Sequence, residues 1–299
     1  MKSLDYKLLQ SLDAIIAEQS FDAASKRLNI TQSAISQRIK QLEEQCTQPV
    51  LVRGTPLKVT ALGAKLLSHY QQIMQLECDL LAEIDPEKST APVPISIALN
   101  ADSIASWFIP AVADVLKIHN IELDLHVVNE SISHELIKNG KAFAAISDKH
   151  TGSPKTKVTP IGNVVYKLCA NPSFRDKYFA NGLNSDSLRL APGINYDHMD
   201  NMHYQFIDQH FGLNKGEYPC HRVRSTEGFV NLALNGVAYS LFPEPQIAQY
   251  LANGKLIDLA PELHLNQPLF WHSWILEKGL RKVISEHVIS WGRKNLNGE

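Results

Sequence analysis

The feature that most constrains the fold is a pair of short amphipathic helices joined by a tight turn, within residues 20–44. Ser20 can cap the first helix, and Thr31 can cap the second after a break at Asn29-Ile30. Residues 4–17 precede the pair, and their apolar side chains recur every three or four positions, as on one face of a scaffold helix. These patterns predict a helix-turn-helix.

The second helix, TQSAISQRIKQLEE, has an outer face of hydrogen-bonding side chains. Glutamine can pair bidentately with adenine, arginine with guanine, and serine with a base or a phosphate, so these residue types suit a helix that reads the major groove. The simpler interpretation is a solvated face of an amphipathic helix. The candidate DNA-contacting residues here are Lys26, Thr31, Gln32, Ser33, Ser36, Gln37, Arg38 and Lys40.

Charge limits the kind of partner. The chain has 29 basic and 31 acidic residues, which excludes a uniformly basic nucleic-acid coat protein or a polybasic membrane binder. Residues 1–60 nevertheless carry eight basic against six acidic side chains, and residues 23–42 hold four basic residues and no acidic one. The sequence therefore predicts a small local basic face.

Residues 50–60, VLVRGTPLKVT, are predicted to form a hairpin, or wing, with Arg53 and Lys58 near its tip as further candidate DNA contacts. A long apolar-striped helix follows over 61–83, either as a core helix or as one that pairs with a second copy of the chain; its length favours pairing. The proline-containing stretch 85–94 then breaks the helical pattern. The predicted divisions are a DNA-binding domain over 1–60 and a dimerising helix with hinge over 61–93.

This arrangement resembles the N-terminal domain of LysR-type transcriptional regulators. The resemblance rests on Ala23-Ala24, Leu28, Thr31-Gln32-Ser33-Ala34, Ser36, Ile39, Leu42-Glu43, Arg53, Thr60 and Gly63. Val52 departs from it, where a Phe is common, and Pro56-Leu57 occupy the usual basic wing tip. The polar helix face and the apolar stripe predict sequence-specific binding to double-stranded DNA by a dimer or tetramer, and contact with RNA polymerase is a further hypothesis.

Residues 94–299 alternate strand-like and helix-like segments, which predicts α/β layers. The predicted strands cover 95–100, 121–129, 141–147, 164–170, 193–196, 221–225, 238–242 and 268–276. The predicted helices cover 103–119 and 131–139, begin at 172 and 226, and lie near 199–211 and over 279–295. Two lobes are predicted, lobe I over about 94–163 and 267–299 and lobe II over about 164–266. The whole chain is thus expected to be an α+β multidomain protein: a winged helix-turn-helix, a long linker helix and a two-lobed α/β domain.

Ligands bind in such folds at the carboxyl ends of strands and at helix N-termini. The candidate ligand-binding residues at these junctions are Asn100, Asp102, Ser103, Ser147, Tyr196, Asp197, Asp200, Thr226 and Glu227. Several acidic residues without a Lys or Arg among them suit a cationic ligand. A zwitterion with a basic side chain fits best, because its carboxylate can bind at the N-terminus of the helix that begins near Ser103. Taken singly, each of these residues can equally be a helix cap without a ligand role.

The whole chain further resembles the lysine- and arginine-responsive ArgP subgroup of that family, also described as inhibitors of chromosome replication initiation. Motifs that carry this resemblance include LNADSIASWFIPAVADVL and NYDHMDNMH. It implies a two-lobed, periplasmic-binding-protein-like effector domain whose ligand is lysine or arginine. Two alternatives stay open: a LysR-type regulator that senses another metabolite, and a weakly specific architectural DNA-binding protein that acts at replication origins.

Other classes find little support. Four separated cysteines indicate neither a disulfide framework nor a zinc site, so no metal or cofactor is expected. The expected location is the reducing cytoplasm. A hydrolase or metal site built on Asp197-His198, His203 and His210 lacks the usual catalytic motifs, so no enzyme is expected. The absence of a signal-peptide pattern and of an 18-residue apolar run argues against a transport binding protein and a membrane partner.

Overall fold

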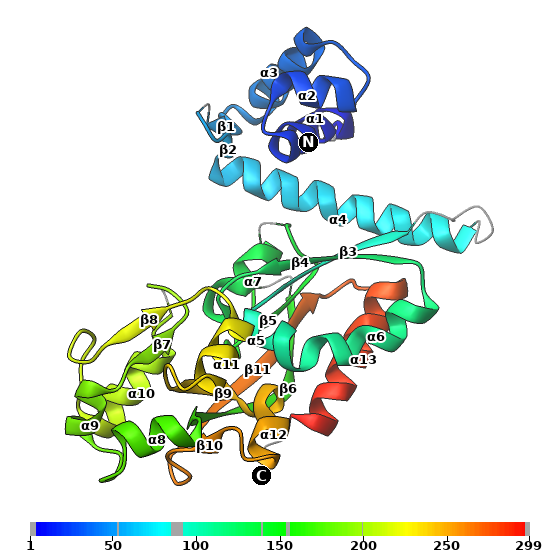
Figure 1. The fold of residues 1–299 in the computed structure, drawn as a ribbon. Helices are drawn as coiled ribbons and strands as arrows, with labels where there is room; N and C mark the ends of the chain where they lie inside the picture. The colour runs from blue at the N-terminus through cyan, green and yellow to red at the C-terminus, as the bar shows by residue number, and fades with distance from the viewer. Residues whose placement is uncertain are drawn as a thin grey trace.

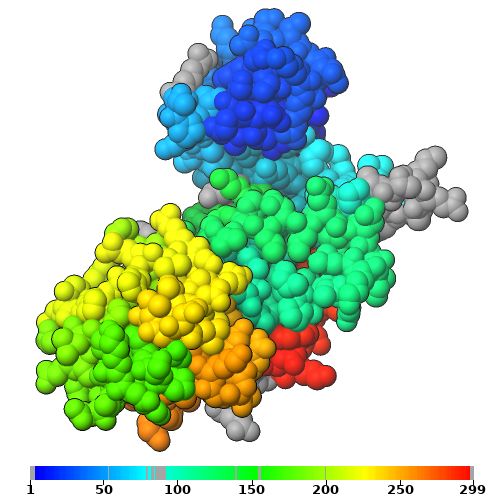
Figure 2. Space-filling view, viewed as in Figure 1, coloured from blue at the N-terminus to red at the C-terminus, as the bar shows by residue number. Residues whose placement is uncertain are grey.

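The computed structural model describes residues 4–52, 54–84, 92–138, 140–153, 156–198 and 200–296. A small helical domain at the N-terminus is separated from a larger C-terminal α/β domain by one long helix that runs between them (Figure 1). The space-filling view shows this helix in contact with both neighbours (Figure 2).

The N-terminal domain contains the predicted helix-turn-helix. Its helices are α1 (Tyr6–Glu18), α2 (Phe21–Arg27) and α3 (Gln32–Cys46). Ser20 Oγ accepts the amide of Ala23, and Thr31 Oγ1 accepts that of Ala34, so both predicted caps form. The core beneath them includes Leu8, Leu9, Leu12, Ile15, Ile35, Ile39 and Leu42.

The predicted wing and long helix are also present. The wing pairs β1 (Leu51–Val52) with β2 (Lys58–Val59), and α4 (Ala61–Ile84) follows with Thr60 Oγ1 accepting the amide of Gly63. Gly63 lies against the wing, because a Cβ at this position would be 2.1 Å from the carbonyl oxygen of Val50. Glycine is therefore needed at this corner.

A mixed seven-stranded sheet forms the centre of the C-terminal domain, in the order β10-β6-β11-β5-β3-β4, with β9 also paired to β6. Its strands are β3 (Val93–Leu99), β4 (Ile121–Val127), β5 (Ala144–Ser147), β6 (Thr156–Ala170), β9 (Ser240–Pro243), β10 (Ile257–Asp258) and β11 (Leu265–Trp274). Strands β6 and β11 run antiparallel from Tyr166↔Leu265 to Thr156↔Trp274 and join the two predicted lobes. Hydrophobic residues from both lobes form one core.

Helices cover this sheet. In lobe I, α5 (Ala101–Ser103), the π-helical turn η1 (Ile104–Phe108) and α6 (Ile109–Ile118) continue one another, α7 (Glu130–Lys138) packs on β5, and α13 (Gly279–Asn295) packs on α6 (Figure 1). Lobe II adds a small parallel pair of strands, β7 (Gly193–Asn195) and β8 (Cys220–Arg222). Its helices are α8 (Pro172–Tyr178), α9 (Ser185–Leu190), α10 (Met202–Phe211), α11 (Thr226–Leu234) and α12 (Glu244–Ala252).

Some elements differ from expectation, among them β10, which was not predicted, and β11, which begins at Leu265 rather than at 268. Strand β6 begins at Thr156 rather than near 164. The start was predicted too late because Pro160 and Gly162 interrupt the apolar pattern, although both pair with β11 at a bulge. Helices α9 and α12 were not predicted, since both are short and α12 starts at Glu244-Pro245 directly after a strand. The divisions at 60/61 and 93/94 stay predictions; α4 begins at Ala61 and β3 at Val93.

Candidate functional site

The outer face of α3 presents most of the predicted DNA-contacting side chains to solvent. The exposed residues are Thr31, Gln32, Ser33, Ser36, Gln37 and Lys40, and Lys58 of the wing is exposed as well. The buried side of the same helix carries Ile35, Ile39 and Leu42. The helix thus exposes side-chain amides and hydroxyls to solvent near its N-terminus, and its apolar side packs into the core of the domain.

The interpretation of an uncompensated basic stretch is wrong in detail. Lys26 Nζ lies 2.7 Å from Asp22, Arg27 lies 3.2 Å from Glu18, and Lys40 Nζ lies 3.9 Å from Glu44. The partners lie just outside residues 23–42, so a linear scan of charge misses pairs that one helical turn or a helix crossing brings together.

Arg38 also differs from expectation. Its Nη1 donates to Ser11 Oγ of α1 at 3.3 Å, and its side chain is half-buried. Ser11 Oγ in turn donates to the carbonyl of Lys7. Arg38 therefore joins α3 to α1 rather than lying wholly on the outer face, and Arg53 lies outside the described residues.

A second candidate site is a cavity of about 310 Å³ between the two lobes of the C-terminal domain. Four carboxylates line it: Asp102 and Glu130 from lobe I, and Asp197 and Asp200 from lobe II. Among the described residues that line the cavity, none is lysine or arginine. The cavity is therefore strongly suited to cations.

The lobe I acids are held by neutral donors. Tyr166 Oη donates to Asp102 at 2.9 Å, and Asn100 Nδ2 donates to Glu130 at 3.2 Å. Burial raises the pKa of Asp102 from its ordinary value to about 7, and burial also raises the pKa of Glu130. The donors in these two hydrogen bonds, a tyrosine hydroxyl and an asparagine amide, are uncharged and so do not neutralise the carboxylates.

The lobe II acids lie in the loop that follows β7. Asp200 accepts the amide of Met202 at 3.0 Å at the start of α10, and burial raises its pKa. Asp197 accepts the amide of Asp200 at 3.2 Å and lies 3.3 Å from an exposed guanidinium nitrogen of Arg224. These backbone bonds fix where both carboxylates lie.

The structure brings together six of the nine predicted ligand-binding residues: Asn100, Asp102, Tyr196, Asp197, Asp200 and Thr226 all line the cavity. Ser103, Ser147 and Glu227 are not among the lining residues. The amide of Ser103 is used by the Asn100 cap, Ser147 Oγ donates to the carbonyl of Glu130, and Glu227 is exposed and bonded to Ser225.

Glu130 was missed by sequence reasoning. It lies between the end of β4 and the body of α7, at the kind of strand-to-helix junction that identified the other residues. The predicted strand extended to Asn129 and the predicted helix started at Ser131, so this acid fell between the two elements. The same junction rule, applied one residue more widely, finds it.

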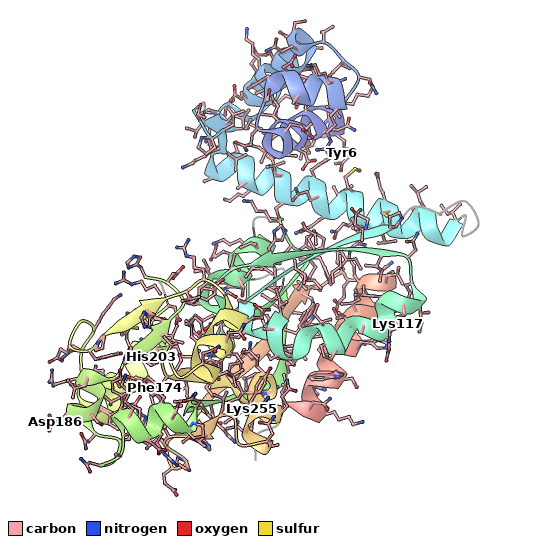
Figure 3. The ribbon with its side chains drawn as sticks, viewed as in Figure 1. Tyr6, Lys117, Phe174, Asp186, His203 and Lys255 are labelled. Atoms are coloured by element: carbon pink, nitrogen blue, oxygen red, sulfur yellow. The ribbon has the colours of Figure 1, made fainter. Side chains whose placement is uncertain are left out.

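His203, considered above for a hydrolase or metal site, lies in α10 of lobe II. It is buried in lobe II at the wall of the cavity, both ring nitrogens lack a hydrogen-bond partner, and burial lowers its pKa to about 4 (Figure 3). In the part of the chain that the structure describes, no group of three His, Cys, Asp or Glu residues is placed to hold a metal ion. No described helix has the length and apolar character needed to cross a membrane.

Comparison with known proteins assigns the family. Residues 6–64 match the bacterial regulatory helix-turn-helix proteins of the lysR family. The HTH-type transcriptional regulator ArgP of Aeromonas salmonicida is 50% identical over 296 residues, which cover 99% of each chain. The chain belongs to the LysR family.

Solved structures of LysR-type regulators agree with this assignment over the full length. The crystal structure of ArgP from Mycobacterium tuberculosis is 32% identical, with a TM-score of 0.88 over 99% of this chain and 100% of that one. Full-length LysG from Corynebacterium glutamicum with bound effector Arg is 27% identical, with a TM-score of 0.81 and the same coverage. The chain is a DNA-binding transcriptional regulator controlled by a small effector, with a winged helix-turn-helix and a two-lobed effector domain.

Proposed function

We propose that this LysR-family regulator senses a basic amino acid, arginine or lysine, in the cavity between its lobes. The observation that carries the proposal is the set of four lining carboxylates, two from each lobe, without a lysine or arginine among the described lining residues. Arginine in the related LysG structure supports the same ligand class. A ligand with two cationic groups can engage acids of both lobes and so favour a closed cleft.

The carboxylate of such an amino acid needs donors. We place it at the helix N-termini of the cavity, where Ala101 begins α5 and Thr226 begins α11, because the first amides of a helix have no partner within it. The predicted position at Ser103 is not proposed again, since its amide already bonds to Asn100.

Calorimetric titration of the full chain with L-arginine and with L-citrulline tests the ligand class. Citrulline has nearly the shape of arginine but lacks the side-chain charge, so it leaves buried carboxylates without a cation. We expect saturable binding of arginine and at least a roughly 30-fold weaker association of citrulline. Equal affinity for the two would refute the acidic-cavity proposal and favour a regulator that senses another metabolite; L-lysine and L-norleucine form a second matched pair.

The effector affinity should depend on pH. The raised pKa of Asp102, about 7, means that the empty cavity takes up a proton as pH falls through neutrality, and a cationic ligand must displace that proton. We therefore expect arginine to bind about tenfold more weakly at pH 6 than at pH 8, with the affinity levelling off above pH 8. Titrations across this range check the sign; tighter binding at the lower pH would contradict it.

We propose that α3 reads bases in the major groove and that the wing contacts the backbone. Gln32, Ser33, Ser36 and Gln37 are the exposed side chains that can hydrogen-bond base edges, and Lys58 can contact a phosphate. These side-chain amides and hydroxyls favour sequence-specific recognition of bases over an architectural role. An architectural protein depends on positive charge and DNA deformation more than on base contacts.

Replacing Gln37 by alanine should lower specific DNA affinity by about tenfold and leave non-specific affinity nearly unchanged, since a bidentate base contact contributes about 1 to 3 kcal/mol of discrimination. Fluorescence anisotropy with an operator selected by this protein from random DNA, and with a scrambled duplex, measures both. Gln45→Ala, at the far end of the same helix, is the control. An equal loss on both duplexes would favour the architectural role.

Self-association is proposed through the second half of α4. Leu76, Leu80, Leu81 and Ile84 are exposed there, with exposed fractions of 38% to 69%. An apolar stripe on a long helix is typical of a helix that pairs with a second copy. A dimer would present two α3 helices to a pseudo-palindromic operator.

The remaining parts of the proposal concern where and how the protein acts. We propose that it acts in the cytoplasm, where it can reach the chromosome, and that it works by binding alone, without catalysis. Contact with RNA polymerase is a further proposal and follows only from its role in transcription.

A further inference from the structure

One helix of the effector domain reaches from the cavity to α4. Helix α7 begins with Glu130, whose side chain lines the cavity, and ends at Lys138, just before a turn at Gly140. Nine residues of α-helix span about 13 Å. Figure 1 shows α7 in the part of lobe I that faces α4.

At the cavity end, α7 is fastened to the sheet. The carbonyl of Glu130 accepts a hydrogen bond from Ser147 Oγ at 2.8 Å, and Ser133 Oγ lies 2.5 Å from the carbonyl oxygen of Ile146. Ser133 and Ser147 are buried. The first turn of α7 is therefore held against the end of β5, so a ligand that pulls on the carboxylate of Glu130 shifts α7 and the end of β5 together.

At the other end, the turn touches the backbone of α4. Gly140 has a φ of +74°, and a Cβ on it would lie 2.6 Å from Ser68 Cα and 2.5 Å from Gln71 Oε1. Ser68 is buried in this contact region, with 8% of its surface exposed. Gly140 has no side chain of its own to hold the turn away from α4, so a shift of one element is passed to the other.

Helix α4 then continues the path into the DNA-binding domain. Gln71 Nε2 donates to Asp13 Oδ1 of α1 at 3.0 Å, so the residue that Gly140 touches is also bonded to the DNA-binding domain. Leu66, Leu67 and Tyr70, from the same two turns of α4, are buried in that domain's core. Helix α1 packs on α3, which carries the proposed base-reading face.

We propose that α7 carries the occupancy of the effector cavity to the DNA-binding domain, through the contact of Gly140 with Ser68 and Gln71 on α4. This inference rests on the proposed function for the identity of the ligand, though not for the contact itself. Binding of the effector to Glu130 moves α7, the Gly140 turn moves with it, and α4 changes its position against α1.

The test is hydrogen-deuterium exchange of the α4 segment 66–74 in the full-length protein. In the unmodified chain, saturating L-arginine should change exchange there by about fivefold or more. In Gly140→Ala, whose added methyl displaces the turn from α4, that change should disappear while calorimetry gives an arginine affinity within twofold of the unmodified chain.

Gly254→Ala is the matched control. Gly254 has a φ of +72°, almost the same as Gly140, and its added Cβ would meet no atom within 4 Å. Both variants therefore carry a similar backbone strain, and only one loses the contact with α4. A full arginine response in Gly140→Ala, or its equal loss in both variants, overturns the proposal.

A second arm needs no ligand. Glu130→Ala removes the hydrogen bond with Asn100 at the cavity end of α7 and should alter exchange at 66–74 in the ligand-free protein. This effect should vanish in the Glu130→Ala, Gly140→Ala double variant if α7 connects the two ends, and additive effects would overturn the coupling. Failure of arginine to bind would count against the ligand proposed above, and this cycle would still decide the role of α7.

Discussion

Exchanging Asp200 for asparagine should weaken arginine binding by about 2 to 3 kcal/mol, or roughly 30- to 150-fold, while DNA binding without effector stays unchanged. Asparagine keeps the side-chain oxygen that accepts the amide of Met202, so the start of α10 should remain intact. What is lost is one negative charge in a cavity that the proposed ligand enters as a cation, together with the long hydrogen bond of 3.4 Å that Asp200 Oδ2 accepts from the amide of Tyr196.

Glu227→Gln provides the comparison for Asp200→Asn. This residue follows the start of α11 by one position, but its side chain is exposed and bonded to Ser225 instead of lining the cavity. Calorimetry should give an arginine affinity within twofold of the unmodified chain. Similar losses for Asp200→Asn and Glu227→Gln would mean that general surface charge, rather than the cavity, attracts the ligand.

Placing alanine at Gly63 should disrupt the DNA-binding domain. The new Cβ would lie 2.1 Å from the carbonyl oxygen of Val50, which also accepts the amide of Thr60 where the wing joins α4. Overpacking against backbone costs about 1 to 3 kcal/mol or more, which for a domain of this size corresponds to a melting temperature lower by roughly 10 °C. Operator affinity should fall at least about tenfold with it.

Gly54→Ala serves as the control for Gly63→Ala, because a Cβ on this exposed wing residue would meet its nearest atom, the carbonyl oxygen of Pro56, at 3.7 Å. Thermal unfolding followed by circular dichroism, combined with calorimetry, separates the two domains: the affinity for arginine should survive in both variants. A Gly63→Ala protein that melts and binds DNA like the unmodified chain would show that the corner between wing and α4 tolerates a side chain.

The sequence predicted the elements whose signals are local. The caps at Ser20 and Thr31, the apolar side of α3 and the length of α4 depend on residues within a few positions of one another, and all are found in the structure. Six of the predicted ligand-binding residues line the cavity, and each lies in a segment that follows a strand, either β3 of the large sheet or β7 and β8 of the small parallel pair.

What sequence reasoning missed depends on contacts between distant segments. The bond of Arg38 to Ser11 spans 27 positions, and that of Arg27 to Glu18 joins two helices, so neither follows from helix periodicity. Glu130 was missed for a different reason, a helix boundary placed one residue too late. A single residue of error matters at a strand-to-helix junction because side chains there change direction at every position.

The ion pairs at the edge of the helix-turn-helix affect how the protein finds its operator. When a cation already has a carboxylate neighbour, its approach to a phosphate releases less of the counterion atmosphere of DNA than an unpaired cation would. Lys26, Arg27 and Lys40 all have such neighbours. The affinity for arbitrary DNA should therefore be lower, and should depend less on salt concentration, than three unpaired cations at these positions would give. Because less protein is then held on the rest of the chromosome, occupancy of the operator is set mainly by base contacts and by the state of the sensor.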